Sequence, residues 1–399
     1  MGKLIEVKEE VVRDKYSLLN IKRFQFGNLL IERPLRALDA KNIRYEHVKT
    51  FFSNHPIIFE KSIFVNLGMF RKIVETNDNR KIRDHFDFPY YAKEFPRYIS
   101  ITFTFNPFRV FESREVAENN LESYLMYYQE YSASSLLVPN IKVYRMAEET
   151  KRVKEVVVTI DEFIDLVDTM YNILGYCNDK PIFVPFSLRF SMADIDKLAD
   201  HYIKREYYNI WIDFEGSAIT EDKIARVRKF IRKFDERGLF NRLVIIVTNI
   251  RREIISNVKK DHTPASDVLA TLIGANIVGV NREPMRPIEG KVVIEHDKLL
   301  EHKARIFDYN TYYYFKVTKA NYLDQETKSK ILMSKETNIA INTKLVDDEF
   351  NRQAEVLINK DDTKEYISSK KMLQEYKQGS LLKALQYSYH VEKQLTEWF

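Results

Sequence analysis

The feature that most constrains the fold of this sequence is a regular alternation of strand-like and helix-like segments over residues 98–280. Short apolar runs such as Tyr98–Phe105, Pro181–Leu188 and Arg242–Ile250 predict strands, and helical periodicity follows them along the chain. The run Arg242–Ile250 is almost continuously apolar, which is typical of a strand buried on both faces. This alternation, repeated about six times, predicts a parallel sheet covered by helices.

Two earlier runs, Arg23–Glu32 and Lys61–Phe70, could supply the first strands. Counted from the first of these to Met285, the span is close to the size of a (β/α)₈ barrel. An open doubly wound sheet is the alternative, which the missing glycine-rich crossover disfavours. We therefore predict an α/β fold with a (β/α)₈ TIM-like barrel over residues 25–290. An N-terminal extension (residues 1–24) and a mostly helical C-terminal region (residues 291–399) complete the chain.

Turn residues predict where the last elements of the barrel begin and end. Pro264 fits the first turn of a helix, Gly274 fits its left-handed cap, and Ala275–Val280 is the predicted final strand. In the C-terminal region an apolar stripe carries Phe350, Ala354 and Leu357 at helical spacing, with Leu381, Leu382, Leu385 and Trp398 further on. We expect this stripe to be buried on the barrel or, as a homodimer contact, on a second copy.

Composition excludes several classes of protein. Neither G-x-G-x-x-G nor G-x-x-x-x-G-K-[ST] occurs, so a Rossmann or Walker nucleotide site is not expected. Cys177 is the only cysteine, which excludes an internal disulfide and Cys-rich metal sites and fits a reducing compartment. His296 and His302 match no usual metal-ligand spacing. We expect a cytoplasmic protein without a membrane segment, metal or cofactor.

Two carboxylates follow directly after the buried run Asn209–Phe214 and are the predicted catalytic residues. Alternation along the strand places Asp213 and Glu215 on the same side. Two close carboxylates push their pKa values apart, which is the usual arrangement of an acid and a base or nucleophile. The alternative reading is that both residues only cap or solvate a loop.

Amides and arginines follow the other predicted strands, where the loops of a barrel gather around its active site. The predicted substrate-binding residues are Asn106, Arg189, Asn249 and Asn281. The predicted phosphate-binding residues are Arg251, Arg252 and Arg282, because guanidinium groups suit phosphate or carboxylate ligands. A net charge of +5 allows a polyanionic partner, and it equally fits a mixed, solvated surface.

Two segments resemble the tRNA-guanine transglycosylase superfamily over about half of the chain. Ser266–Pro284 is similar to the family's helix–glycine–strand before its nucleophile loop, and Asn342–Leu373 to its closing helical segment. The family's Asp-Ser-Gly-Gly-Phe stretch would fall near Asn106, where this chain reads TFTFNPFRV. Gly279, Asn281 and Arg282 occupy the region of its nucleophilic aspartate, and its zinc site is impossible with one cysteine. If the kinship holds, the acid chemistry moved to Asp213 and Glu215 or was lost.

These observations lead to one main hypothesis and two alternatives. The main hypothesis is a barrel enzyme that modifies a nucleotide or nucleic-acid base, by transglycosylase-like base exchange or N-glycosidic cleavage. The first alternative is a non-catalytic barrel that binds DNA or RNA. The second is a metabolic barrel enzyme with a small phosphorylated substrate, which the same arginines would serve.

Overall fold

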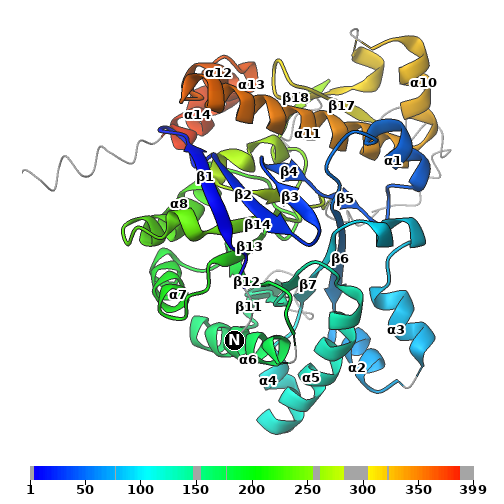
Figure 1. Cartoon of the computed structure of the whole chain (residues 1–399), viewed down its shortest axis with the longest axis vertical. Coiled ribbons are helices and arrows are strands. Elements are labelled where there is room, and N and C mark those ends of the chain that lie inside the picture. The colour runs from blue at the N-terminus through cyan, green and yellow to red at the C-terminus, as the bar shows by residue number, and fades with distance from the viewer. Residues whose placement is uncertain are drawn as a thin grey trace, which may run out of the picture.

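The computed structural model describes residues 4–76, 78–146, 154–176, 178–254, 261–282, 304–320 and 323–386, and within them the chain forms a closed parallel barrel (Figure 1). Each neighbouring pair of barrel strands is parallel, and β16 pairs with β4 to close the ring. The first and fourth strand positions are each split in two. In chain order the strands are β4 (Leu35–Arg36) with β5 (Leu38–Asp39), β6 (Phe59–Val65), β7 (Arg97–Phe103), β8 (Leu136–Leu137) with β9 (Asn140–Ile141), β12 (Ile182–Ser187), β13 (Asn209–Asp213), β14 (Val244–Thr248) and β16 (Ile277–Val278). The predicted (β/α)₈ barrel is confirmed.

Helices follow the strands along the chain and cover the outside of the barrel. They are α1 (Tyr45–Phe51), α2 (Leu67–Val74), α3 (Asn79–Phe86), α4 (Pro107–Val110), α5 (Arg114–Tyr131), α6 (Ile160–Gly175), α7 (Met192–Lys204) and α8 (Glu221–Asp235). Short 3-10 helices lie in the connections: η1 (Tyr90–Glu94) and η2 (Phe240–Arg242) in the barrel, and η5 (Val317–Lys319) and η6 (Tyr376–Gly379) in the C-terminal region. The helix α6 begins at a capping box, in which the hydroxyl of Thr159 and the carboxylate of Glu162 each accept from the other's backbone N–H.

The segment before the last strand differs from the predicted helix. Two 3-10 turns, η3 (Asp267–Leu269) and η4 (Thr271–Ile273), take its place, and Gly274 ends them in the left-handed conformation with φ of 98° as predicted. Pro264 does not start a helix, since it lies in the strand β15 (His262–Pro264). The three residues of β15 pair with β18, so their backbone groups are used in a sheet instead.

The run Arg23–Glu32 is not a barrel strand, and this part of the prediction is wrong. It forms most of an antiparallel hairpin, β2 (Asn20–Phe26) and β3 (Leu29–Ile31), next to β1 (Val7–Arg13). Gly27, with φ of 60°, opens the two-residue turn and allows this tight connection. The rings of Phe24 and Phe26 are buried in one apolar cluster with Tyr98 and Trp211 of the barrel. The hairpin therefore supplies apolar side chains to the barrel interior.

The C-terminal region packs on the barrel. Its strands β17 (Arg305–Asp308) and β18 (Tyr313–Lys316) join β15, and its helices are α10 (Gln325–Met333), α11 (Lys335–Lys360), α12 (Lys364–Ser368), α13 (Lys371–Glu375) and α14 (Ser380–Leu385). The long helix α11 contacts β4 and η3 (Figure 1). The carboxylate of Asp347 on α11 accepts from the Arg33 guanidinium and from the backbone N–H of Arg36. The predicted stripe is thus buried on the chain's own barrel, while a homodimer remains a prediction.

Some sequence-based statements fall outside the described residues. They concern the predicted domain boundary between residues 290 and 291 and the side chains of Cys177, His296, His302 and Trp398. Within the described ranges, none of the helices combines the length and apolar character needed to cross a membrane.

A matched pair of substitutions on α11 tests whether this helix is an integral part of the barrel. Leu357 is fully buried and its neighbour Ile358 is 57% exposed. We expect Leu357→Ala to lower the free energy of unfolding by about 3 kcal/mol, because it leaves a cavity in a packed core. Ile358→Ala should change it by less than about 0.5 kcal/mol. Urea denaturation measures both, and equal effects would contradict the docking of α11.

Candidate active site at the carboxyl end of the barrel

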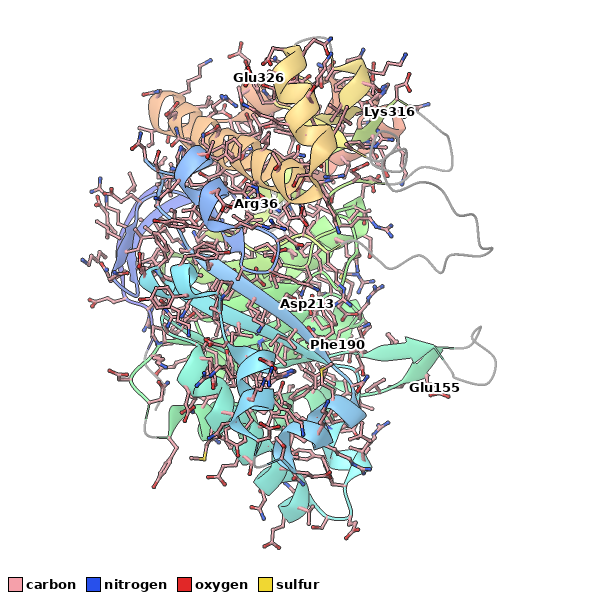
Figure 2. All side chains as sticks on the ribbon, turned by 90° about the vertical axis from the view of Figure 1, so that its right-hand side faces the viewer. Arg36, Glu155, Phe190, Asp213, Lys316 and Glu326 are labelled. Carbon is pink, nitrogen blue, oxygen red and sulfur yellow. The ribbon has the colours of Figure 1, made fainter. Side chains whose placement is uncertain are left out.

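The carboxylate of Asp213 is buried at the carboxyl end of β13, in the interior of the molecule (Figure 2). One oxygen accepts from the hydroxyl of Thr102 at 2.5 Å and from the amide of Asn140 at 3.3 Å. The other accepts from the amide of Asn249 at 2.9 Å and from the backbone N–H of Glu215 at 2.8 Å. Donors from three other strand positions therefore fix the orientation of this carboxylate.

The loops after β13, β14 and β16 are joined by backbone hydrogen bonds. The N–H of Gly216 donates to the carbonyl of Asn249, and the N–H of Asn249 donates to that of Val280. Glu215 and Asn249 have positive φ values of 49° and 55°, which are uncommon outside glycine. Such backbone conformations persist only where the surroundings enforce them, and they cluster at functional sites.

Glu215 lies beside Asp213 with one carboxyl oxygen that has no hydrogen-bond partner among the described residues. This oxygen, Oε1, is buried, and Oε2 lies 3.8 Å from Nε of Arg189. Burial, and next to it the charge of Asp213, raises the pKa of Glu215 to about 7, against the opposing effect of Arg189, Lys142 and Lys223. Glu215 can therefore hold or release a proton near neutral pH, as a general acid or base must.

Glu60, the second residue of β6, is another buried acid, which the sequence analysis did not predict. It is completely buried and accepts from the hydroxyls of Ser100, Thr248 and Tyr98 and from the backbone N–H of Val280. Burial raises its pKa to about 7 despite these hydrogen bonds. Its alternation with Ile58 and Ser62 was the available signal, because it places Glu60 on the inner face of the strand.

Gly279 provides the space for the Glu60 carboxyl. A Cβ atom at position 279 would lie 2.0 Å from Oε2 of Glu60 and 2.7 Å from Oγ1 of Thr248. A side chain there would force one of these groups to move. Gly279 is therefore needed for the packing of the polar layer that Glu60 and Thr248 form below the acid pair.

The predicted substrate-binding amides occupy three different settings. Asn249 holds Asp213, and its own oxygen accepts from the Ser62 hydroxyl at 2.8 Å. Asn106 caps α4 by accepting from the N–H of Phe108, which leaves its buried Nδ2 without an acceptor among the described residues. Asn281 donates to Asp267 at 2.6 Å, and its buried Oδ1 likewise has no hydrogen-bond partner in the described ranges.

The predicted phosphate-binding arginines separate into two groups. The guanidinium of Arg282 lies over the ring of Phe64, and its buried Nη1 has no acceptor in the part of the chain that the structure describes. Burial lowers the pKa of Arg282, while Asp213 and Glu215 oppose that shift, so its charge is close to the acid pair. Arg251 has a buried Nε that also lacks an acceptor there. Arg252 instead bonds to Glu253 and lies over the ring of Tyr314.

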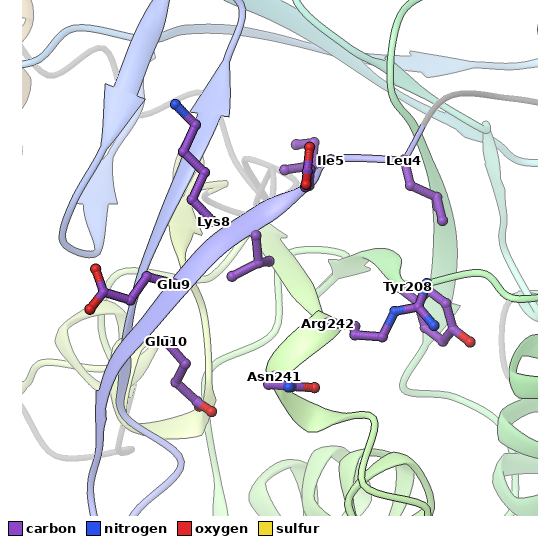
Figure 3. Close-up of a pocket in the computed structure, with 10 residues that line it drawn as sticks. Leu4, Ile5, Lys8, Glu9, Glu10, Tyr208, Asn241 and Arg242 are labelled. Carbon is purple, nitrogen blue, oxygen red and sulfur yellow. The ribbon is translucent and has the colours of Figure 1, made fainter.

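The acid pair is distinct from a shallow recess at the opposite end of the barrel. This recess of about 380 Å³ is lined by residues of β1 and by Tyr208, Asn241 and Arg242, which precede β13 and β14 (Figure 3). Within the described residues no group of three or more His, Cys, Asp and Glu side chains could hold a metal ion.

The fold and site together define a (β/α)₈ barrel with a buried acid pair at the carboxyl ends of its strands. No family model and no curated protein matches the sequence. Similar solved structures include GH26C from Muricauda sp. MAR_2010_75, with 10% identity over 65% of this chain and 82% of that chain and a TM-score of 0.40. A modular endo-beta-1,4-mannanase from Cellulomonas fimi has 9% identity over 65% of this chain and 68% of that chain, with a TM-score of 0.37.

A third similar structure is DHODH from Eimeria tenella, with 10% identity over 53% of this chain and 57% of that chain and a TM-score of 0.31. At these identities the likeness concerns the fold alone. The activities of these proteins therefore say nothing about the activity of this chain.

The raised pKa of Glu60 predicts a pH dependence of stability. Glu60 is more easily protonated in the folded chain than in the unfolded chain, so its contribution is full below about pH 4.5 and is lost as pH rises to about 7. When pH is raised from 5 to 8, the free energy of unfolding of the wild type should fall by about 3 kcal/mol more than that of Glu60→Gln. Urea denaturation at both pH values measures this, with Glu112→Gln, at an exposed position, as the control. Parallel pH profiles for wild type and Glu60→Gln would contradict the assignment.

Proposed function

We propose that this protein is an enzyme that cleaves or exchanges the N-glycosidic bond of a nucleotide or nucleic-acid base. The observation that carries the proposal is the contrast within the acid pair. Glu215 has a carboxyl oxygen without a hydrogen-bond partner among the described residues and a pKa raised to about 7, whereas Asp213 is held by four donors. Glycosidic cleavage needs such a pair, an acid for the leaving group and a carboxylate for the developing positive charge on the sugar.

Each carboxylate has a defined task in this reaction. Protonated Glu215 gives its proton to the departing base nitrogen as the bond between C1′ and that nitrogen breaks. Asp213 stabilises the cationic sugar through the negative charge of its carboxylate, whose position is fixed by its hydrogen-bond donors. Water or an incoming base then bonds to C1′ and returns a proton to Glu215, which restores the starting state.

The resemblance to the transglycosylase superfamily supports this choice of bond, although its nucleophile and zinc ligands have no counterpart in this sequence. The metabolic alternative, a small phosphorylated substrate, fits one observation equally well: Asp213 is only 1% exposed, which suits a small molecule as much as a base turned out of its stack. A non-catalytic nucleic-acid-binding barrel is the least supported of the three. Simple binding gives no reason for an acid with a pKa near neutrality.

Two substitutions test the assigned roles. Asp213→Asn and Glu215→Gln keep the shape of each side chain, and each should lower kcat by about 100-fold or more. Proton transfer by Glu215 and charge stabilisation by Asp213 typically contribute that much each. The assay measures release of free base, and incorporation of labelled base, with nucleosides, nucleotides, single-stranded DNA and RNA. Activity of the wild type should fall above about pH 7 as Glu215 loses its proton, and Glu215→Gln should lack this limb.

Arg109→Gln is the control variant at the same end of the barrel, because both guanidinium contacts of Arg109 to Glu162 lie outside the acid pair. It should retain wild-type kcat. Unchanged turnover in Asp213→Asn would assign that residue a structural role and overturn the proposal. The absence of any base release or exchange by the wild type would leave the metabolic alternative in its place.

A further inference from the structure

The acid pair is surrounded by more positive than negative charge. The cations that act on Glu215 are Arg189, Lys142 and Lys223, and Arg282 in turn feels both Asp213 and Glu215. These four cations outnumber the two carboxylates and leave a local charge of +2, or +3 when Glu215 is protonated. Such an excess is costly where the groups are buried, as at Nη1 of Arg282, unless an anion joins them.

Among the described residues, the cations of this site have weaker carboxylate contacts than cations elsewhere on the barrel. Arg109 forms a two-point ion pair with Glu162 at 2.7 Å, and Arg114 contacts both Glu118 and Asp165 at 2.7 Å. By contrast, Nη1 of Arg282 is buried without an acceptor among the described residues. The guanidinium of Arg189 comes no closer than 3.8 Å to Glu215. These groups have unused capacity to donate hydrogen bonds to an anion.

An aromatic ring holds two of these cations over the site. Arg282, after β16, and Lys142, after β9, both lie over the ring of Phe64 at the carboxyl end of β6. Gly216 lies next to Arg282: a Cβ atom at position 216 would be 3.8 Å from the Arg282 side chain, an ordinary contact, so its φ of 74° is what favours glycine there. The ring thus fixes cations that reach the acid pair from two sides of the barrel.

We propose that the substrate carries a phosphate group and that Arg282, Lys142 and Arg189 bind this phosphate beside Glu215. This inference rests on the proposed function for the position of the reacting bond and adds the chemical class of the substrate. Three cations from three strand ends suit a tetrahedral dianion better than a planar carboxylate. A phosphate monoester, with about two negative charges, also offsets the local excess of +2. Lys223 stays structural, because it donates to the carbonyl of Leu188.

Binding of inorganic phosphate at low salt, measured by isothermal titration calorimetry on the full chain, tests this site directly. Arg282→Gln and Lys142→Met should each weaken phosphate binding by about 10-fold to 100-fold, the usual loss for a charge-assisted hydrogen bond. Arg109→Gln removes the same charge from an already neutralised pair and should bind phosphate within about twofold of the wild type. A nucleoside 5′-monophosphate should bind more tightly than its parent nucleoside, and this preference should shrink in both site variants.

The two proposals fail in different ways. Equal phosphate affinity in wild type, Arg282→Gln and Lys142→Met would overturn the phosphate site, even if Asp213→Asn still abolishes base release. Phosphate binding that depends on these two residues, without base release from any nucleotide, would support the site and remove the glycosidic reaction. Tighter binding of ribose 5-phosphate than of the nucleotide would likewise support the phosphate site and indicate a small phosphorylated substrate. Lys142→Met serves as the second variant if Arg282→Gln fails to fold.

Discussion

The burial of the Asp213 carboxylate at the end of the barrel is the constraint on which the rest of the structure depends. A buried carboxylate is costly unless hydrogen bonds replace the water that it lost. Here the replacements come from Thr102, Asn140 and Asn249, on three other strand positions. These donors converge on Asp213 only if the strands are held in register, so the site can form only in the closed barrel.

A polar layer inside the barrel leaves the apolar packing of the interior to the end opposite the acid pair. Glu60, Ser100 and Thr248 fill positions that apolar side chains usually occupy in barrels of this type. The apolar core inside the barrel is therefore confined to the other end, where Trp211 packs with Phe24 and Phe26 of the N-terminal hairpin. The hairpin adds buried apolar side chains to the barrel interior, where the polar layer contributes few. This accounts for a three-stranded sheet that lies outside the ring of barrel strands but packs against it.

The sequence predicted what periodicity can encode and missed what depends on distant partners. Strand–helix alternation was enough to predict the barrel, and Asp213 with Glu215 was placed at its carboxyl end. The hairpin was misread because an apolar run of strand length looks the same inside and outside a barrel. Glu60 was missed because its burial depends on Ser100, Thr248 and Gly279, which are 40 to 219 residues away in the sequence. Likewise, only the structure shows that Glu253 engages Arg252 while Arg282 lies near the acid pair.

Two buried acids have a pKa near 7, and their surroundings assign them different tasks. Every hydrogen-bonding direction of the Glu60 carboxyl group is engaged by a donor, so a proton that it holds has no path to a substrate. The free oxygen of Glu215 has the opposite character, because burial removes water from it and no described side chain replaces that water. The two acids therefore have a similar pKa, although the hydrogen bonds of the Glu60 carboxyl group are complete and those of the Glu215 carboxyl group are not. Only an incomplete network has room for the atom that receives the proton, and this difference makes Glu215 the proton donor of the site.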